Sequence, residues 1–288
     1  MNNQLKLFLK KIIPSNLRSK IKKNRRRINN SFKSGVAKTT LNHMRDLLVN
    51  DFEIVNGDNL IISSSFGNLN AEFSPKELIQ LLQEIVGEDG NIVMPFYPPG
   101  NSYEWAESNQ VFDMKTTRSS MGILTQVFSE MPNVHKSIHP TKAVVAWGKN
   151  AAEIVTGHEN SKTPFYWDSP YGWLLKNKSK SLGLGVLNRP IIHACEDCTF
   201  GPIMYLPQKY CLPVRQIDGK IIDIQVYVHS QKKMKSLTEI NNLMDNFLLN
   251  TYKKVKIGFQ FSYIFDVNEL FVRFKENKLD FNEPHSHF

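Results

Sequence analysis

The sequence contains few cysteines and no long apolar run, and both absences exclude whole classes of protein. Cys195, Cys198 and Cys211 are too few and too clustered for a disulfide framework, so we expect a reducing compartment. No apolar run approaches the ~20 residues that a membrane-spanning helix needs. Lys6 and Lys10 interrupt the first apolar stretch and no small-residue cleavage site follows, so we predict no signal peptide and a cytoplasmic protein.

Acidic residues are missing from the first part of the chain. Residues 1–45 hold 13 Lys and Arg and no Asp or Glu. Residues 46–288 therefore hold 23 basic and 27 acidic residues, a net charge of −4 within a chain whose total charge is +9. The chain is thus expected to consist of a basic arm, 1–45, and a body of globular composition, 46–288.

Residues 1–30 of the arm combine an apolar stripe with many cations. Leu5, Phe8 and Ile12 recur at helical spacing, and Pro14 ends the predicted helix. Such a segment suits the anionic surface of a membrane, where each cation contributes roughly 1 kcal/mol, so peripheral association with the inner face of the cytoplasmic membrane is one expectation. A solvated tail and an acidic partner are the alternatives. Nucleic acid is not expected, because no aromatics are interleaved with these charges.

In the body, strand patterns alternate with helical patterns. The predicted strands cover 60–62, 90–95, 143–147 and 181–186, and the predicted helices cover 75–86, 121–131 and 151–156. After Pro213 we expect a β-rich run over 215–228, a helix over 237–249 and then short strands. This α/β alternation predicts a sheet covered by helices.

One segment pairs an imidazole with a carboxylate. His193 stands three residues before Glu196, just after the glycine-punctuated apolar run 181–186. If that run is a buried strand and the next segment opens a helix, the two side chains share a helix face. The carboxylate then holds one ring nitrogen and leaves the other free as a base. A lone His-x-x-Glu is more often structural, so its surroundings decide.

The same segment allows two other chemistries. His193, Cys195 and Cys198 have the spacing of half a zinc site, with Cys211 as a further thiol, but the chain has no second cysteine pair and no metal is expected. Cys195 as a nucleophile would lack a dedicated second base, which disfavours a thiol mechanism. Ordinary buried thiols are the favoured interpretation.

Six short motifs follow one another along the body. They are Ser63 to Gly67, Met94 to Phe96, Lys136 to Pro140, Asp168 to Leu174, Leu182 to Gly185, and His193-x-x-Glu196. No single motif is decisive, but their common order and spacing resemble the aminoglycoside 3-N-acetyltransferase family. The resemblance extends over roughly residues 45 to 260.

The resemblance implies a fold and a reaction. The fold is a three-layer α/β/α sandwich with a central mixed sheet, preceded here by the basic helical arm, and it differs from that of the GNAT acetyltransferases. The implied reaction transfers acetyl from acetyl-CoA to an amino group of a sugar. By position, His193 resembles the catalytic histidine of the family and Glu196 its partner carboxylate, so His193 would take the amine proton while Glu196 fixes its tautomer.

Further site residues follow from the same resemblance. The residues expected to line the CoA channel are Ser65, Phe66, Ser137, His139 and Pro140. The residues expected to contact the acceptor are Asp168, Ser169 and Tyr171. For His139 the alternative is a turn residue satisfied by backbone, and for Ser169 and Asp168 it is a turn and a helix cap.

The chain departs from the family pattern at four positions. Lys136 stands where the family has Arg, which keeps the charge but loses the bidentate fork. Ser63 replaces a frequent His, Thr141 a frequent Asp, and Pro190 a common Thr. These differences leave acetyl transfer plausible and leave the acceptor open.

Three functions of different class are therefore compared. The favoured one is N-acetylation of an amino sugar of a surface polysaccharide or of its lipid- or nucleotide-linked precursor. The basic amphipathic arm favours it, because an enzyme that modifies drugs does not need to be located at a membrane. The second is an aminoglycoside-resistance enzyme, for which a polycationic drug favours a strongly acidic cleft. The third is an inactive binding protein, which an intact His193 and Glu196 argue against. The oligomeric state is open, because the apolar stretch 259–265 suits either a core or a dimer seam.

Overall fold

The computed structural model describes residues 35–202, 204–229 and 252–277 of the chain. Residues 39–288 form a compact unit separate from residues 1–38. Thr39 forms a parallel bridge with Ala71, and Met44, on α3 (Leu41–Asp46), is fully buried. The expected boundary after residue 45 therefore falls within α3. The amphipathic segment predicted for residues 1–30 lies outside the described residues.

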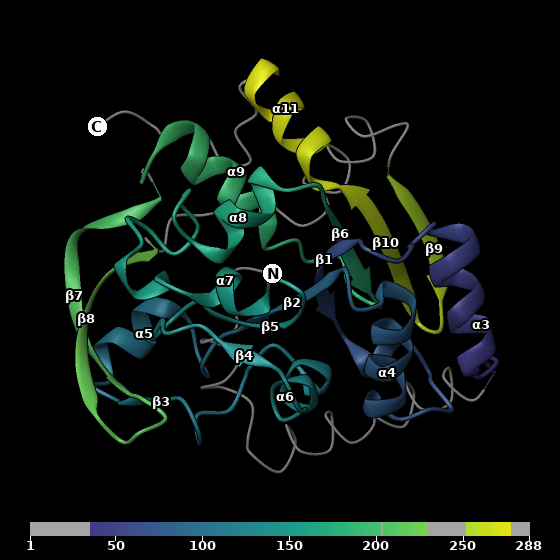
Figure 1. The fold of residues 1–288 in the computed structure, drawn as a ribbon, viewed down its shortest axis with the longest axis horizontal. Helices are drawn as coiled ribbons and strands as arrows, with labels where there is room; N and C mark the ends of the chain where they lie inside the picture. Colours follow the sequence, from purple (N-terminus) through teal and green to yellow (C-terminus); the bar gives the residue numbers. More distant parts are fainter. Residues whose placement is uncertain (1–34, 203, 230–251, 278–288) are drawn as a thin grey trace, which may run out of the picture. The chain divides into compact units, whose positions relative to one another are not determined.

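A seven-stranded mixed sheet forms the centre of this unit (Figure 1). In spatial order its strands are β4 (His135–Lys136), β5 (Ala143–Gly148), β2 (Asn91–Phe96), β1 (Asn59–Ser64), β6 (Ser179–Leu184), β10 (Gln260–Asp266) and β9 (Lys253–Ile257). The three central strands, β2, β1 and β6, are parallel, while β5 and β10 run antiparallel on either side of them. The central strands are almost wholly buried, as expected for parallel strands covered on both faces.

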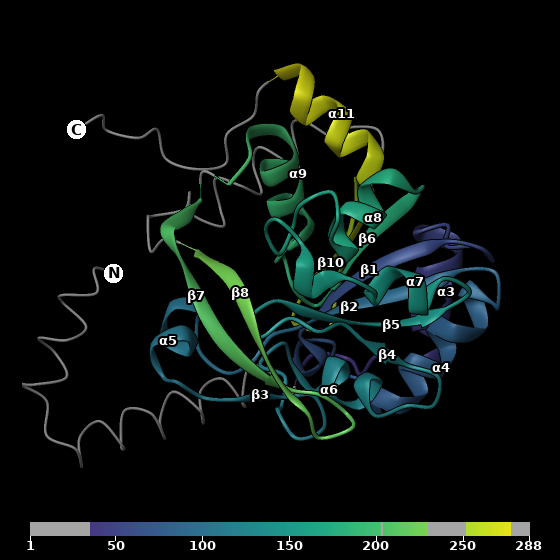
Figure 2. The same cartoon turned by 60° about the vertical axis from the view of Figure 1, so that its left-hand side comes forward.

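Helices cover both faces of the sheet, which gives three layers (Figures 1 and 2). Leu60 and Ile62 of β1 contribute to one core and Ile61 to the other, because successive strand residues point to opposite faces. One core contains the buried faces of α3, α4 (Pro75–Val86) and α6 (Ile123–Ser129). The other contains those of α7 (Ala151–Val155), α8 (Pro170–Lys176), α9 (Ile191–Phe200) and α11 (Val267–Asn277). The expected three-layer α/β/α fold is confirmed.

A second, smaller sheet flanks the first. It contains β3 (Phe112–Asp113), β7 (Tyr205–Arg215) and β8 (Ile221–His229), and α5 (Ser102–Glu107) packs against β8. Leu212 and Val214 on β7 and Val226 on β8 belong to the core that contains α4. The long hairpin therefore joins the main body through an apolar face, and β8 ends at His229 (Figure 2).

Most predicted elements are confirmed, and helix α4 shows why. Ser74 and Glu77 form a reciprocal capping box, and Pro75 occupies the first turn. Near the C-terminus one predicted boundary is wrong and one element was missed. The β-rich run begins at Tyr205, so Pro213 lies within β7 and not before the run. This is possible because β7 pairs only with β8 over most of its length, and proline can occupy such an edge strand. Helix α11 was not predicted.

The second half of the stretch 259–265 belongs to the core, whereas Phe261 is exposed. The stretch forms most of β10, which lies between β6 and β9, and Tyr263, Ile264 and Phe265 are buried. The predicted helix 237–249 lies outside the described residues. Within the described ranges, none of the helices has the length and apolar character needed to cross a membrane.

Candidate active site

The carboxyl ends of β1 and β6 form the edge on which the candidate site is built. Their connections diverge, because β1 leads to β2 on one side while β6 leads into α9. Open α/β sheets bind ligands at such points. The two turns are tied together: the Ser65 amide donates to Leu184 O at 2.9 Å, and Asn68 Nδ2 donates to Gly185 O at 2.9 Å.

Helix α9 carries the predicted acid–base pair. His193 Nδ1 lies 2.9 Å from Glu196 Oε2, one helical turn away. The carboxylate is 1% exposed and the imidazole 21% exposed, so solvent reaches the histidine of this pair but not the glutamate. A carboxylate on Nδ1 selects the tautomer whose proton is on Nδ1. The contact between His193 and Glu196 is the one that the sequence spacing predicted, and His193 Nε2 makes no hydrogen bond to the described part of the chain. The action of His193 as a base stays a prediction.

Two aromatic rings surround His193. Phe165 lies 5.1 Å from it, centroid to centroid, and His229 lies at the same distance with its plane turned by 85°. Nε2 of His229 is buried without a hydrogen-bond partner among the described residues. Burial, helped by His193 and Lys142, lowers the pKa of His229 well below its ordinary value, so this ring is neutral. His229 was not predicted, because no sequence spacing links the end of β8 to α9.

A buried carboxyl lies beside this pair. Asp197, next to Glu196 in sequence, accepts hydrogen bonds from the hydroxyls of Thr163 and of Tyr205, the latter at 2.5 Å. Burial raises the pKa of Asp197 to about 6, against the opposing effect of the two hydroxyls. The ring of Tyr205 also meets His229 edge-on at 4.6 Å. Asp197 and Tyr205 thus connect α9 to the β7–β8 hairpin, and neither was predicted.

Ser137 and His139 lie inside the protein. Ser137 is fully buried, accepts from the Val144 amide at 2.8 Å and bonds His158 Nδ1 at 2.9 Å. Nδ1 of His139 accepts from the amides of Thr141 and Lys142. These contacts fix the turn between β4 and β5, which is the turn role considered for His139. Their place in a CoA channel stays a prediction.

The other predicted CoA residues lie nearer the edge. Ser65 and Phe66 are partly buried in the turn after β1, where the Phe66 ring packs edge-on against Phe73. Pro140 is buried in the turn before β5. Ser64 Oγ, at the end of β1, is buried without a partner among the residues described. The contact of Ser65, Phe66 and Pro140 with CoA stays a prediction.

The predicted acceptor residues serve local structure. Asp168 accepts from Ser161 Oγ and the Lys162 amide, and Ser169 is the N-cap of α8. Tyr171 is fully buried, and its hydroxyl lies 2.7 Å from that of Tyr97. A direct contact of these residues with an acceptor stays a prediction.

Two lysines near the same edge, Lys136 and Lys142, form no ion pair with the described residues. Lys142 Nζ sits over the Tyr97 ring at 4.2 Å, and burial lowers its pKa to about 8. Lys136 Nζ donates to Met114 O at 2.8 Å and sits over the Phe96 ring at 3.9 Å; burial lowers its pKa to about 8 as well.

All three cysteines are free, and Cys195 and Cys198 are unsuited to nucleophilic chemistry. Burial raises the pKa of the Cys195 thiol well above its ordinary value and that of Cys198 to about 12. Both thiols stay protonated at neutral pH, whereas a nucleophile must be a thiolate. The described ranges contain no group of three or more His, Cys, Asp or Glu side chains that could hold a metal ion.

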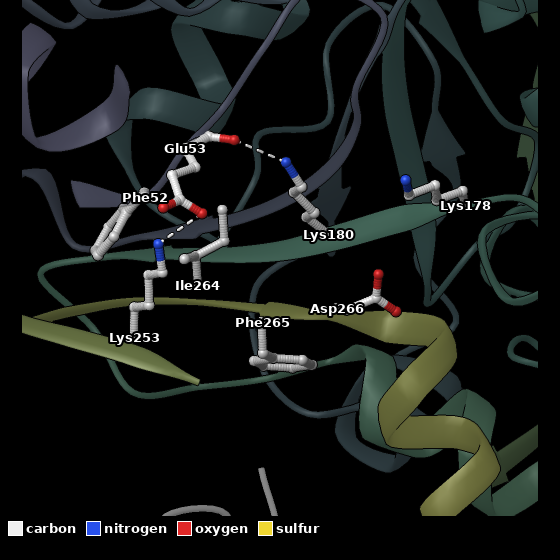
Figure 3. Close-up of a pocket in the computed structure, with 8 residues that line it drawn as sticks. All are labelled: Phe52, Glu53, Lys178, Lys180, Lys253, Ile264, Phe265 and Asp266. Carbon is white, nitrogen blue, oxygen red and sulfur yellow. Dashed lines mark hydrogen bonds and ion pairs between the residues drawn. The ribbon is translucent and has the colours of Figure 1, made fainter. Parts of the chain in front are cut away.

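A separate pocket lies at the opposite end of the central strands (Figure 3). Its lining includes Lys178 and Lys180, at the start of β6. Lys180 Nζ bonds Asp58 Oδ2 at 2.7 Å, and Lys253 pairs with Glu53 at 2.8 Å. These charges are already paired, and the pocket lies at the edge away from His193.

Comparison with known proteins shows the family. The profile described as Aminoglycoside 3-N-acetyltransferase matches residues 61–278. The Bacillus subtilis (strain 168) protein YokD, named an SPbeta prophage-derived aminoglycoside N(3')-acetyltransferase-like protein, is 32% identical over 98 residues, 28% of this chain and 36% of YokD. The match thus spans about a third of that relative.

Solved structures share the fold. The apoenzyme of the aminoglycoside acetyltransferase AAC(3)-IVa is 22% identical with a TM-score of 0.68, over 87% of this chain and 93% of that one. AAC-IIIb, solved as a binary complex with CoASH, is 17% identical with a TM-score of 0.68, over 86% of this chain and 100% of that one. The chain belongs to the aminoglycoside 3-N-acetyltransferase family, and the predictions of an N-acetyltransferase and of acetyl-CoA as its co-substrate are confirmed at the level of that family.

Proposed function

We propose that the chain is an acetyl-CoA-dependent N-acetyltransferase that acts on an amino sugar of a surface polysaccharide or of its precursor. The observation that carries this proposal is the 2.9 Å contact between His193 Nδ1 and Glu196 Oε2, which leaves Nε2 as a base at the ligand edge of the sheet. An unreactive binding protein would not need this arrangement. Family membership supplies the reaction class.

In the proposed reaction His193 acts as general base. The neutral acceptor amine attacks the thioester carbonyl carbon, so a C–N bond forms while Nε2 of His193 takes the amine proton. Glu196 stabilises the resulting imidazolium through Nδ1. The C–S bond then breaks, and CoA leaves as a thiolate that takes a proton from the imidazolium or from water. No covalent enzyme intermediate is involved, in keeping with the protonated thiols of Cys195 and Cys198.

We propose that the thioester end of acetyl-CoA lies along the turn after β1. Ser65 and Phe66 stand there, close to the unpartnered hydroxyl of Ser64. Backbone amides at this edge are candidate donors to the developing oxyanion. The effect of Ser137, His139 and Pro140 on the CoA site would be indirect, through the turn that leads into β5.

The acceptor class rests on the basic arm. Residues 1–45 carry 13 cations and no acid, and an amphipathic basic segment would bring the enzyme to an anionic membrane surface, where polysaccharide precursors are assembled. The arm, residues 1–45, would thus locate the enzyme at the membrane, and the acetyltransferase body, residues 46–288, would carry out the reaction. Liposome flotation with and without residues 1–30 tests this part.

An aminoglycoside acceptor is the second candidate. An AAC(3)-IVa variant has been solved in complex with a gentamicin, and AAC-VIa bound to sisomicin. Both are at most 21% identical to this chain. Against it, the carboxylates beside His193 are already committed, since Glu196 bonds His193 and Asp197 bonds two hydroxyls. A polycationic drug has no acidic surface to bind among these groups.

The decisive test is acetyl transfer by the wild type and by His193→Ala. With acetyl-CoA and a panel of amino sugars and aminoglycosides, we expect His193→Ala to lower kcat by roughly 10²- to 10⁴-fold. His43→Ala is the matched control, because His43 is exposed on α3, in the opposite helix layer. Full activity of His193→Ala would refute the assigned base. Efficient turnover of gentamicin together with none of the amino sugars would replace the first acceptor class by the second.

A further inference from the structure

Lys142 is a partly buried cation without a counter-charge. Its ammonium forms no ion pair and no hydrogen bond with the described residues, and its close neighbour is the face of the Tyr97 ring, 4.2 Å away. An aromatic face compensates only part of the hydration that a buried ammonium loses. Two other partly buried lysines have oxygen partners: Lys136 donates to Met114 O, and Lys180 bonds Asp58. Lys142 therefore has unused capacity for an anion.

The position of Lys142 is fixed by the sheet register. It precedes β5, whose first residue, Ala143, pairs with Phe96 at the carboxyl end of β2. Tyr97 follows directly and bonds the hydroxyl of Tyr171. Lys142 thus lies at the carboxyl edge of the parallel strands, the same edge from which the chain enters α9. Lys149, at the other end of β5, lies at the opposite edge and pairs with Asp89.

Lys142 also lies on the same side of the sheet as the proposed base. The Tyr97 ring below its ammonium bonds the Tyr171 hydroxyl at 2.7 Å, and the Phe165 ring meets the rings of both Tyr171, at 4.6 Å, and His193, at 5.1 Å. The phosphates of CoA are separated from its thioester by the whole pantetheine arm. A cation close to the base is therefore close to the acceptor, whose amine must reach the base, and far from those phosphates.

The negative charges of this region are already used. Glu196 holds His193, and Asp197 is bonded by Thr163 and Tyr205. Both carboxylates are 1% exposed. Among the described residues of this region, a cationic acceptor would thus meet the unpaired ammonium of Lys142, whereas Glu196 and Asp197 already form hydrogen bonds.

Resting on the proposed function, we propose that the acceptor amino sugar carries an anionic group, a phosphate or a carboxylate, and that Lys142 binds it. Lysine binds phosphate as a point charge, so a single ammonium suffices. A sugar phosphate, a nucleotide- or lipid-linked amino sugar and an amino-uronic acid share this chemistry. The acceptor class is thereby narrowed from amino sugars in general to negatively charged ones, and polycationic aminoglycosides fall outside it.

The test compares charged and uncharged amino sugars. Binding to the full-length protein with CoA present is measured by calorimetry for glucosamine, glucosamine 1-phosphate, glucosamine 6-phosphate, the 2-amino-2-deoxy-uronic acid of glucose, and gentamicin, followed by kcat/KM for each with acetyl-CoA. We expect at least one charged sugar to bind at least tenfold more tightly than glucosamine. Lys142→Met should reduce that ratio at least tenfold, and Lys142→Arg should retain part of it. Lys149→Met, a lysine of the opposite edge, should leave it unchanged.

Several outcomes would overturn the inference. One such outcome is that glucosamine or gentamicin binds as tightly as every charged sugar. Another is that none of these compounds binds detectably. A Lys142→Met variant that keeps the wild-type ratio would do so too. If Lys142→Met weakens acetyl-CoA binding instead, the anion belongs to CoA and the assignment to the acceptor is wrong.

The proposed function fails in a different way. One outcome is acetyl transfer to glucosamine or gentamicin that depends on His193 but does not change in Lys142→Met. This result would support the proposed function and refute the inference about Lys142. Binding of a charged sugar that depends on Lys142, without His193-dependent acetyl transfer to any amine, would remove the proposed function.

Discussion

The ring of His229 meets the ring of His193 edge-on, with 5.1 Å between the centroids and 85° between the planes. Because burial keeps the pKa of His229 well below its ordinary value, the neighbour of the base is a neutral ring at physiological pH. A neutral neighbour does not oppose the positive charge that His193 would acquire in the proposed reaction, when it takes the amine proton. The fold thus supplies a close, aromatic and uncharged wall for the base, opposite the carboxylate of Glu196.

Glu196→Gln should show whether Glu196 acts by orienting His193 or by its negative charge. The amide can still reach His193 Nδ1, but it no longer stabilises an imidazolium, and it can also donate and thereby favour the wrong tautomer. A hydrogen bond to a charged group contributes about 1.5–3 kcal/mol, so we expect kcat to fall roughly 10- to 150-fold with little change in Tm. Glu269→Gln, which removes a partly exposed pair with Arg273 on α11, should leave kcat unchanged. An unaffected kcat in Glu196→Gln would remove the carboxylate from the mechanism.

Stability should fall below about pH 6.5. His139, His158 and His229 are buried with lowered pKa values, about 4 for His158, because burial penalises their charged forms. In the unfolded chain each titrates near 6.5, so the unfolded state binds more protons as the pH falls and the folded state loses stability. Asp197 acts oppositely below about pH 6, because its raised pKa lets the folded state bind its proton first.

The expected slope is therefore roughly two net protons, on the order of 1–3 kcal/mol per pH unit between pH 6 and 5. Urea unfolding at pH 5, 6, 7 and 8 measures it. His229→Phe keeps a ring against His193 and should flatten the slope by about one proton. A free energy of unfolding that does not change between pH 7 and 5 would contradict the burial of these rings.

Lys142→Met should stabilise the protein at neutral pH. Burial lowers the pKa of Lys142 from its ordinary value to about 8, so its charged form destabilises the folded state below pH 8, and this penalty disappears above the unfolded value near 10.5. We expect a gain of about 1–3 kcal/mol at pH 7 that shrinks at pH 10. Lys149→Met, at an exposed position, should change little. A loss of stability in Lys142→Met would show that the ammonium has a structural partner.

The sequence predicted those parts of the fold that depend on neighbours along the chain. The capping box of Ser74 and Glu77 marked the start of α4, and the three-residue spacing placed His193 against Glu196. Both are contacts within one helical turn, which residue order alone determines. Lys142 and His229 could not be found in this way, because their approach to the site depends on strand order and register.

Motif alignment also located residues without revealing their roles. Ser137 and His139 belong to a family motif, yet in the structure they bond amides of the turn and strand that follow and His158. A motif shows that a residue type is needed near a site, whereas packing decides whether it faces the ligand or supports the backbone behind it. For His139 the sequence did offer this alternative, since a His-Pro pair such as His139-Pro140 commonly stands in a turn.

Gly183→Ala should disturb fold and site together. A Cβ at Gly183, on β6, would lie 2.0 Å from the ring of Tyr263, which faces it from β10 and is fully buried. The Tyr263 hydroxyl donates to Asn188 O at 2.6 Å, in the loop that leads into α9 and His193. The ring cannot move without releasing that loop, so we expect a loss of about 1–3 kcal/mol and a reduced kcat. Gly67→Ala, where a Cβ meets nothing within 4 Å, is the control for stability. If Gly183→Ala keeps the wild-type Tm and kcat, then Tyr263 does not position the loop that carries the base.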